Sequence, residues 1–193
     1  MQHGRLHWFT PDELDERQRA FYDRLLAGPR DKKGVVDGSG RLIGAFNARL
    51  LDPPVGTAIQ ELGAALRFGT VLSDRQREIA ILTVAQAEQC SYEWNAHAEV
   101  GRRVGLTEAE LEALRTGRGL GPEASPEENL TWQVVRTLVT AGDLPDAGYD
   151  EAVRVLGEPA LFDLISLTGH YRHTALAIRV WRVPLREGET KVF

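Results

Sequence analysis

Apolar positions recur every three or four residues along most of the chain, which is the spacing of helices that bury one face. The clearest example runs from about residue 159 to residue 181. Its core-facing positions are Leu161, Leu164, Thr168, Tyr171, Ala175 and Ile178. Further apolar residues widen this stripe, so we expect the helix to pack on two sides, one of which could be another subunit. Because no stretch shows sustained strand alternation, the pattern predicts an all-α fold of about eight or nine helices.

Four helix starts are marked by a capping box, in which Ser or Thr is followed three residues later by Glu or Gln. The pairs are Thr10 with Glu13, Ser73 with Gln76, Thr107 with Glu110, and Ser125 with Glu128. Pro11 and Pro126 take the first helical position, where proline is favoured. These signals and the apolar spacing predict helices over 11–27, 53–68, 74–88, 92–104, 108–115, 126–140, 147–156 and 159–181. The glycine-rich segment 34–44 is predicted to be a loop, with a short hairpin of 35–36 and 42–43 as the alternative.

The length and composition of the chain fit one globular domain. A chain of 193 residues can bury a single core. We expect one domain over 1–193, with an N-terminal helix and glycine-rich loop (1–52), a central region (53–116) and C-terminal helices (125–182). The net charge of −5 and the lack of a Lys/Arg-rich run predict no nucleic acid and no membrane as partner. No apolar stretch is long enough to span a bilayer, no signal peptide is visible and there is one cysteine, so we expect a cytoplasmic protein.

The residues from Glu78 to His97 form the most unusual segment. The stretch 79–87 is apolar on nearly all sides of a helix, which predicts burial, and a buried Glu78 carboxylate needs a partner or a raised pKa. Glu93 and His97 are neighbours on a helix, and Cys90 falls on the same face if the helix includes it. A thiol, a carboxylate and an imidazole on one face predict proton transfer near neutral pH. His97 and a position at the helix N-terminus could also lower the pKa of Cys90.

Structural interpretations of the same residues remain open at this point. Cys90 could be a small core residue, and Glu93 with His97 could be a solvated pair. Glu78 could serve only to complement the start of its helix. Spacing alone does not choose between these interpretations and a functional cluster.

Three motifs resemble the carboxymuconolactone decarboxylase-like family, which also includes the alkylhydroperoxidase D-type proteins. They are Arg77–Leu82, Cys90–His97 and Gly105–Leu111. Two further segments, Gly44–Asn47 with the following Leu50-Leu51 and Pro53-Pro54, and Gly169–Arg172, extend the resemblance over most of the chain. The resemblance implies an alkylhydroperoxidase D-like helical bundle, a small-molecule substrate, no cofactor, and a homo-oligomer that is a dimer, trimer or hexamer.

The peroxidase branch of that family has a glutamate, a Cys-x-x-Cys pair and a histidine, which fall on Glu78, Cys90, Glu93 and His97. The position of Glu93 is that of the peroxide-reactive cysteine, so the substitution argues against dithiol turnover, in which a second thiol resolves a sulfenic acid. The decarboxylase branch uses acid–base groups around its histidine, and Glu78, Glu93 and His97 suit that role. The resemblance therefore implies either a peroxiredoxin-type antioxidant activity through Cys90 or acid–base chemistry on a small carboxylated or lactone-like molecule. The alternative is a non-catalytic helical oligomer that binds a small ligand or partner through a satisfied polar network.

A second group of candidate residues lies outside this segment. His170, Tyr171 and Arg172 could line a substrate pocket, where Arg172 would bind a carboxylate with two hydrogen bonds. Trp94 is a further candidate for substrate binding, although a role in the core or at an interface is the simpler interpretation. His170 and His173 could share a metal, but because no motif such as His-Glu-x-x-His is present we predict no metal site.

Overall fold

Helices make up nearly all of the regular structure in the computed structural model, which describes residues 1–193. The α-helices are α1 (Glu16–Ala27), α2 (Pro53–Phe68), α3 (Asp74–Ala87), α4 (Ser91–Arg103), α5 (Glu108–Arg115), α6 (Pro126–Ala141), α7 (Asp146–Leu156) and α8 (Glu158–Trp181). Shorter 3-10 helices are η1 (Pro11–Glu13), η2 (Lys32–Gly34) and η3 (Gly44–Leu51). The short strands β1 (Gln2–His3) and β2 (Leu6–His7) pair antiparallel near the N-terminus. The predicted all-α class is confirmed, and none of the helices has the length and apolar character needed to cross a membrane.

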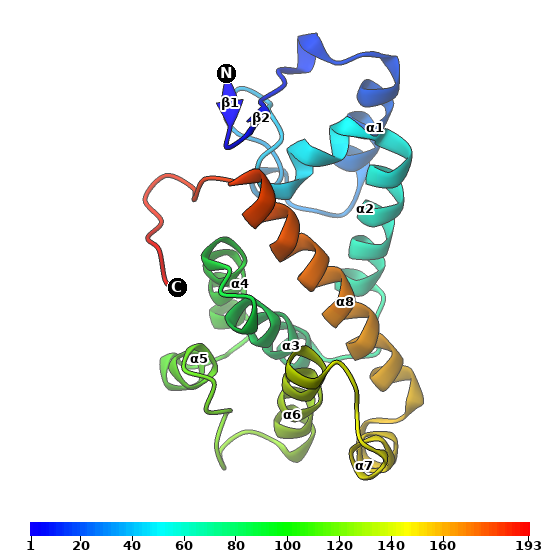
Figure 1. Cartoon of the computed structure of the whole chain (residues 1–193), viewed down its shortest axis with the longest axis vertical. Coiled ribbons are helices and arrows are strands. Elements are labelled where there is room, and N and C mark those ends of the chain that lie inside the picture. The colour runs from blue at the N-terminus through cyan, green and yellow to red at the C-terminus, as the bar shows by residue number, and fades with distance from the viewer.

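Helix α3 forms the centre of the molecule. Every residue from Glu78 to Ala85 is buried, and the helix packs against α4, α6 and α8. Figure 1 shows α8 running diagonally across the molecule, with α1 and α2 on one side and α3 to α7 on the other. Large side chains such as Ile81 and Leu164 are fully buried in the cluster that joins α3, α6, α7 and α8. Each such side chain contributes roughly 1.5–3 kcal/mol to stability, so α3 and α8 are held firmly in place.

The capping boxes at Ser73, Thr107 and Ser125 form as predicted, and α3, α5 and α6 begin at the following residue. The first prediction is wrong in one respect. The box at Thr10 forms, but it starts only η1, because Leu14 has an extended backbone conformation (φ −74°, ψ 130°). Asp15 then provides a second cap, in which its carboxylate accepts the N–H of Gln18, and α1 begins at Glu16. Two competing caps five residues apart therefore divide the predicted helix.

The segment between α1 and α2 folds back toward α4. Within the glycine-rich region a single antiparallel bridge joins Val36 and Leu42, so the segment is a loop with a minimal hairpin. Helix η3, which the sequence analysis did not predict, follows at once. It begins at Gly44, whose φ of +60° and close approach to Tyr92 exclude a side chain, since a Cβ would stand 2.6 Å from the Tyr92 hydroxyl. This close approach brings Arg49, which lies in η3, toward α4 and α8.

The C-terminal tail, residues 183–193, lies along α4 (Figure 1). The Ser91 hydroxyl accepts hydrogen bonds from the backbone N–H groups of Val192 and Phe193, at 3.0 Å each. The Phe193 ring packs edge-on against Trp94, with ring centres 5.5 Å apart. The tail also carries Arg186, which contacts the Tyr92 hydroxyl at 3.5 Å.

Candidate functional site

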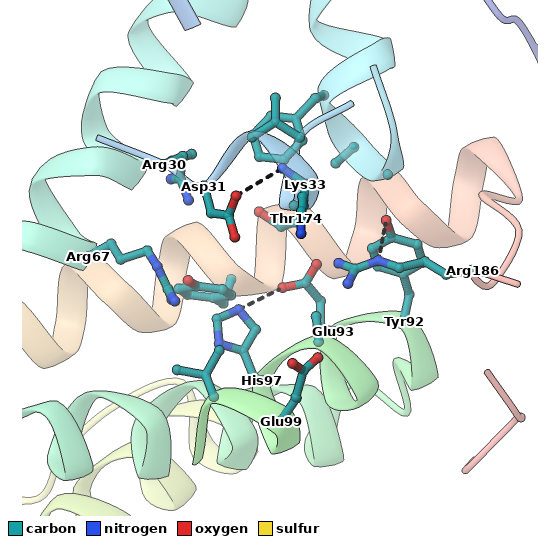
Figure 2. Close-up of a pocket in the computed structure, with 18 of the residues that line it drawn as sticks. Arg30, Asp31, Lys33, Arg67, Tyr92, Glu93, His97, Glu99, Thr174 and Arg186 are labelled. Carbon is teal, nitrogen blue, oxygen red and sulfur yellow. Dashed lines mark hydrogen bonds and ion pairs between the residues drawn. The ribbon is translucent and has the colours of Figure 1, made fainter. Parts of the chain in front are cut away.

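A cavity of about 660 Å³ opens between α4, α8 and the segment that contains η2 and η3. Figure 2 shows Glu93 and His97 pointing into it from α4, with Arg30, Asp31 and Lys33 on the opposite side. Arg67 and Arg186 lie toward the two ends of this view. Helix α4, which carries Glu93 and His97, packs against the buried helix α3, so this wall of the cavity is fixed in position.

His97 is held by a carboxylate behind it. Its Nδ1 lies 2.7 Å from Oε2 of Glu78, a residue only 1% exposed, and Arg67 reaches the other oxygen of Glu78 at 3.4 Å. Burial favours the neutral form of Glu78, but the charge and hydrogen bond of His97, with Arg67 and Arg77, bring its pKa below the ordinary value. An ionised Glu78 accepts the Nδ1–H of His97, which leaves Nε2 facing the cavity. The prediction that a buried Glu78 has a partner is confirmed.

Glu93 lies on the cavity side of the same imidazole. Its Oε2 is 3.7 Å from His97 Nε2, longer than a hydrogen bond. Burial raises the pKa of Glu93 above its ordinary value, against the opposing effect of His97 and three arginines. Two carboxylates whose pKa values are displaced in opposite directions therefore flank one histidine, which is the arrangement that separates acid and base roles in enzymes.

Cys90 does not join this group. Helix α4 begins at Ser91, and Cys90 precedes it with an extended backbone (φ −98°, ψ 92°), so the helical spacing to His97 does not apply. The thiol packs instead with Tyr92, Ala175 and Ile178 and does not line the cavity. Burial raises the pKa of Cys90 to about 11, although the backbone N–H groups of Tyr92 and Glu93 oppose the change. The expectation of a lowered pKa is therefore wrong, because desolvation outweighs the helix N-terminus.

The second group of predicted residues divides in two. His170 and Tyr171 line the cavity, and the Tyr171 ring meets the His97 ring edge-on at 5.2 Å and the His170 ring at 5.4 Å. Trp94 does not line the cavity, because it packs with the apolar residues of α3 and α5. Arg172 is also outside, since its guanidinium pairs with Glu88 at 3.0 Å. Neither residue therefore lines the cavity that contains Glu93 and His97.

The sequence did not predict most of the residues that line the cavity, and the basic ones are the most numerous of its charged residues. The basic residues that line the cavity are Arg30, Lys33, Arg49, Arg67, Arg103 and Arg186, against the acidic residues Asp31, Glu93 and Glu99. The cavity is thus positively charged although the chain carries a net charge of −5. These residues come from five separate segments, so no local run of basic residues indicates the cavity in the sequence. The nearest signal was the motif at Gly44–Asn47, which precedes Arg49 by two residues.

The two histidines considered as metal ligands do not share a site. His170 lines the main cavity, whereas His173 lines a separate, mostly apolar pocket beside Trp181. No three His, Cys, Asp or Glu side chains are arranged to hold a metal ion.

The arrangement of the helices is that of an alkylhydroperoxidase D-like bundle. The chain superposes on the alkylhydroperoxidase AhpD core of an uncharacterised peroxidase-related protein from Ralstonia eutropha JMP134, with a TM-score of 0.75 and 17% identity. The match covers 97% of this chain and 94% of the other, which establishes the fold. Residues 53–131, from α2 into α6, match the model of the carboxymuconolactone decarboxylase family. The family resemblance predicted from the sequence is confirmed, while no curated protein matches the chain.

Proposed function

We propose that this protein is an enzyme that transfers a proton to or from a small carboxylated molecule bound in the arginine-lined cavity. The family segment and the fold support a peroxidase-related or decarboxylase-like protein. The observation that favours the second is the Glu78–His97–Glu93 row, in which one imidazole nitrogen is held at 2.7 Å and the other faces the cavity.

Each residue of the row has a separate role in this proposal. His97 exchanges a proton with the substrate through Nε2. Glu78 is a positioning residue, because its carboxylate orients the ring and stabilises the imidazolium form through the hydrogen bond to Nδ1. Glu93, whose pKa is raised by burial, carries a proton at a pH where an ordinary glutamate would have lost it. The basic residues of the cavity hold the negative charge of the substrate.

The reaction class proposed is decarboxylation of a carboxylate that lies next to a carbonyl-conjugated carbon. The bond from that carbon to the carboxylate breaks, carbon dioxide leaves, and the electron pair remains on the substrate as an enolate. His97 then donates its proton to the carbon and regains one from water through Glu93. Arginines near the enolate oxygen would lower the energy of this charge as it forms.

Thiol-dependent peroxide reduction is the second candidate, because the similar Ralstonia protein is described as peroxidase-related and Cys90 precedes the N-terminus of α4. Three features of the chain disfavour it. Glu93 stands in place of a second cysteine, Cys90 lies outside the cavity, and burial raises its pKa to about 11.

The test is a pH–rate profile for a panel of carboxylated lactones and β-keto acids, with alkyl peroxides and a dithiol in parallel. We expect turnover of a member of the first group, a loss of about 10²–10⁴-fold in kcat in His97→Gln, and a displaced pH profile in Glu78→Gln. Glu108→Gln, an exposed residue that pairs with Arg102, is the control for loss of a carboxylate. Peroxide turnover that depends on Cys90 would overturn the proposal, and a folded protein with no turnover on either group would favour the non-catalytic alternative.

We also propose that the chain associates with copies of itself. Apolar side chains are exposed along α8, and they are Phe162 (70%), Ile165 (50%), Leu176 (52%) and Val180 (45%). An aligned stripe of this kind is typical of an interface. Sedimentation at micromolar concentration should give an oligomer, and a monomer would contradict this part of the proposal.

A further inference from the structure

Two arginines of the cavity have no carboxylate partner. The Arg30 side chain makes no hydrogen bond or ion pair, and its Nε is buried without a partner. Arg49 donates only to the amide oxygen of Gln60, at 2.6 Å. Both guanidinium groups lie near the Phe46 ring, 5.6 Å and 4.7 Å from its centre. The charge of Glu93 acts on both arginines but forms no ion pair with either, and burial favours the neutral form of Glu93. Burying a cation without a paired counter-charge is costly, so the two guanidinium groups can accept a further negative charge.

The other arginines of the cavity provide the contrast. Arg67 pairs with the carboxylate of Glu78, Arg103 with that of Glu99, and Arg186 with that of Glu189. These three arginines of the cavity each have an acidic neighbour. Arg30 and Arg49 are therefore exceptions within one cavity, and both lie on the wall opposite α4 (Figure 2 labels Arg30).

His170 completes the same corner of the cavity. At Gly63 of α2, an added Cβ would stand 2.8 Å from Nε2 of His170 and 3.2 Å from a terminal nitrogen of Arg30. The two side chains thus meet over a helix position that has no side chain of its own. Burial, together with the charges of Arg49 and Arg30, lowers the pKa of His170 to about 4. The imidazole is therefore neutral at pH 7 and can donate one hydrogen bond without adding charge.

We propose that Arg30, Arg49 and His170 form a binding site for an oxyanion, a carboxylate of the substrate other than the one that leaves, across the Tyr171 ring from His97. The Tyr171 ring is in edge contact with both His97 and His170. Guanidinium groups recognise carboxylates through paired hydrogen bonds, and inorganic phosphate offers the same chemistry. A ligand with a carboxylate at this site places its opposite end near Nε2 of His97. The identity of the anion as the substrate rests on the proposed function, but the binding site itself does not.

The experiment measures anion binding without turnover. Succinate is titrated at pH 7 into the full chain labelled on histidine, with the ring signals of His170 identified by their loss in His170→Gln. Calorimetry on the same samples gives the affinity. Dimethyl succinate, which is neutral, and inorganic phosphate are titrated in parallel. We expect succinate to shift the His170 signals, dimethyl succinate to have no effect, and the affinity for succinate to fall about tenfold or more in Arg30→Gln and in Arg49→Gln.

Two further variants separate this proposal from the proposed function. Arg24→Gln removes an exposed arginine of α1 that pairs with Glu61, outside the cavity, and should bind succinate like the unmodified protein. His97→Gln removes the proton-transfer group and should still bind succinate, so a failure of catalysis leaves the site standing. Succinate binding that is unchanged in Arg30→Gln, or no response of His170, would overturn the proposal. Binding of phosphate but not of succinate would overturn its assignment to a carboxylate.

Discussion

His170 makes the stability of the protein depend on pH in a calculable way. The residue is 8% exposed, and burial with the charges of Arg49 and Arg30 lowers its pKa from 6.5 to about 4. The unfolded chain therefore binds a proton at a higher pH than the folded chain. The free energy of unfolding is therefore unaffected by His170 above about pH 6.5, and it falls as the pH is lowered toward 4. Each unit of difference in pKa is worth about 1.4 kcal/mol, so the whole effect is about 3–4 kcal/mol and most of it is lost by pH 4.5.

The assay is urea unfolding from pH 7.5 to pH 4.5 on the unmodified chain, on His170→Gln and on the control His173→Gln. Glutamine cannot take up the proton, so the free energy of unfolding of His170→Gln should fall less on acidification than that of the unmodified chain, by about 2–3 kcal/mol. Other groups titrate in all three proteins and cancel in the comparison. His173→Gln removes an exposed histidine from the same helix and should follow the unmodified chain. Parallel curves for the unmodified chain and His170→Gln would refute the reasoning.

Three further predictions concern two of the helix glycines, the thiol and the buried Glu78–His97 pair. Gly169→Ala in α8 adds a methyl group to open space and should raise the free energy of unfolding by about 0.5–1 kcal/mol in urea, whereas Gly63→Ala crowds His170 and should lose that gain through overpacking of about 1–3 kcal/mol. An equal gain at both sites would mean that the space over Gly63 is not needed. Alkylation of Cys90 should titrate above pH 10, in line with a pKa near 11, and a midpoint at or below the ordinary value of about 8.5 would return the thiol to the catalytic candidates. Glu78→Gln should lower the free energy of unfolding by about 1–3 kcal/mol, because the amide keeps only one of the two oxygens that accept from His97 and Arg67 and carries no negative charge, and an unchanged urea midpoint would show that the pair adds no stability.

Local signals in the sequence predicted the helices well because a cap is decided by residues within one turn. Ser73, Thr107 and Ser125 each begin a helix as predicted. The same kind of signal was misleading at Thr10, where Asp15 offers a competing cap. Burial of α3 also followed from its composition, so the partner of Glu78 was a sound prediction.

The cavity could not be predicted in the same way. Its basic residues come from segments that are distant in the chain and meet only through the path of the loop after α1. Helix η3 depends on a close approach between Gly44 and Tyr92, which no periodicity records. Cys90 illustrates a different difficulty, since the predicted face required a helix that includes Cys90, whereas α4 begins at Ser91. A predicted site near a helix end therefore depends on the exact residue at which the helix begins.

The way in which the C-terminal tail is attached has a consequence for the lifetime of bound molecules. The backbone N–H groups of the last two residues are held by one hydroxyl, that of Ser91, and their side chains pack at the edge of the core cluster that contains Trp94. A chain end with so few backbone hydrogen bonds opens at a lower free energy than the core, so the amides of Val192 and Phe193 should exchange with deuterium before those of α3. Arg186 at the cavity rim belongs to the same tail. Opening of the tail as far as Arg186 would expose one side of the cavity while the rest of the fold stays intact, so ligand dissociation would not require global unfolding.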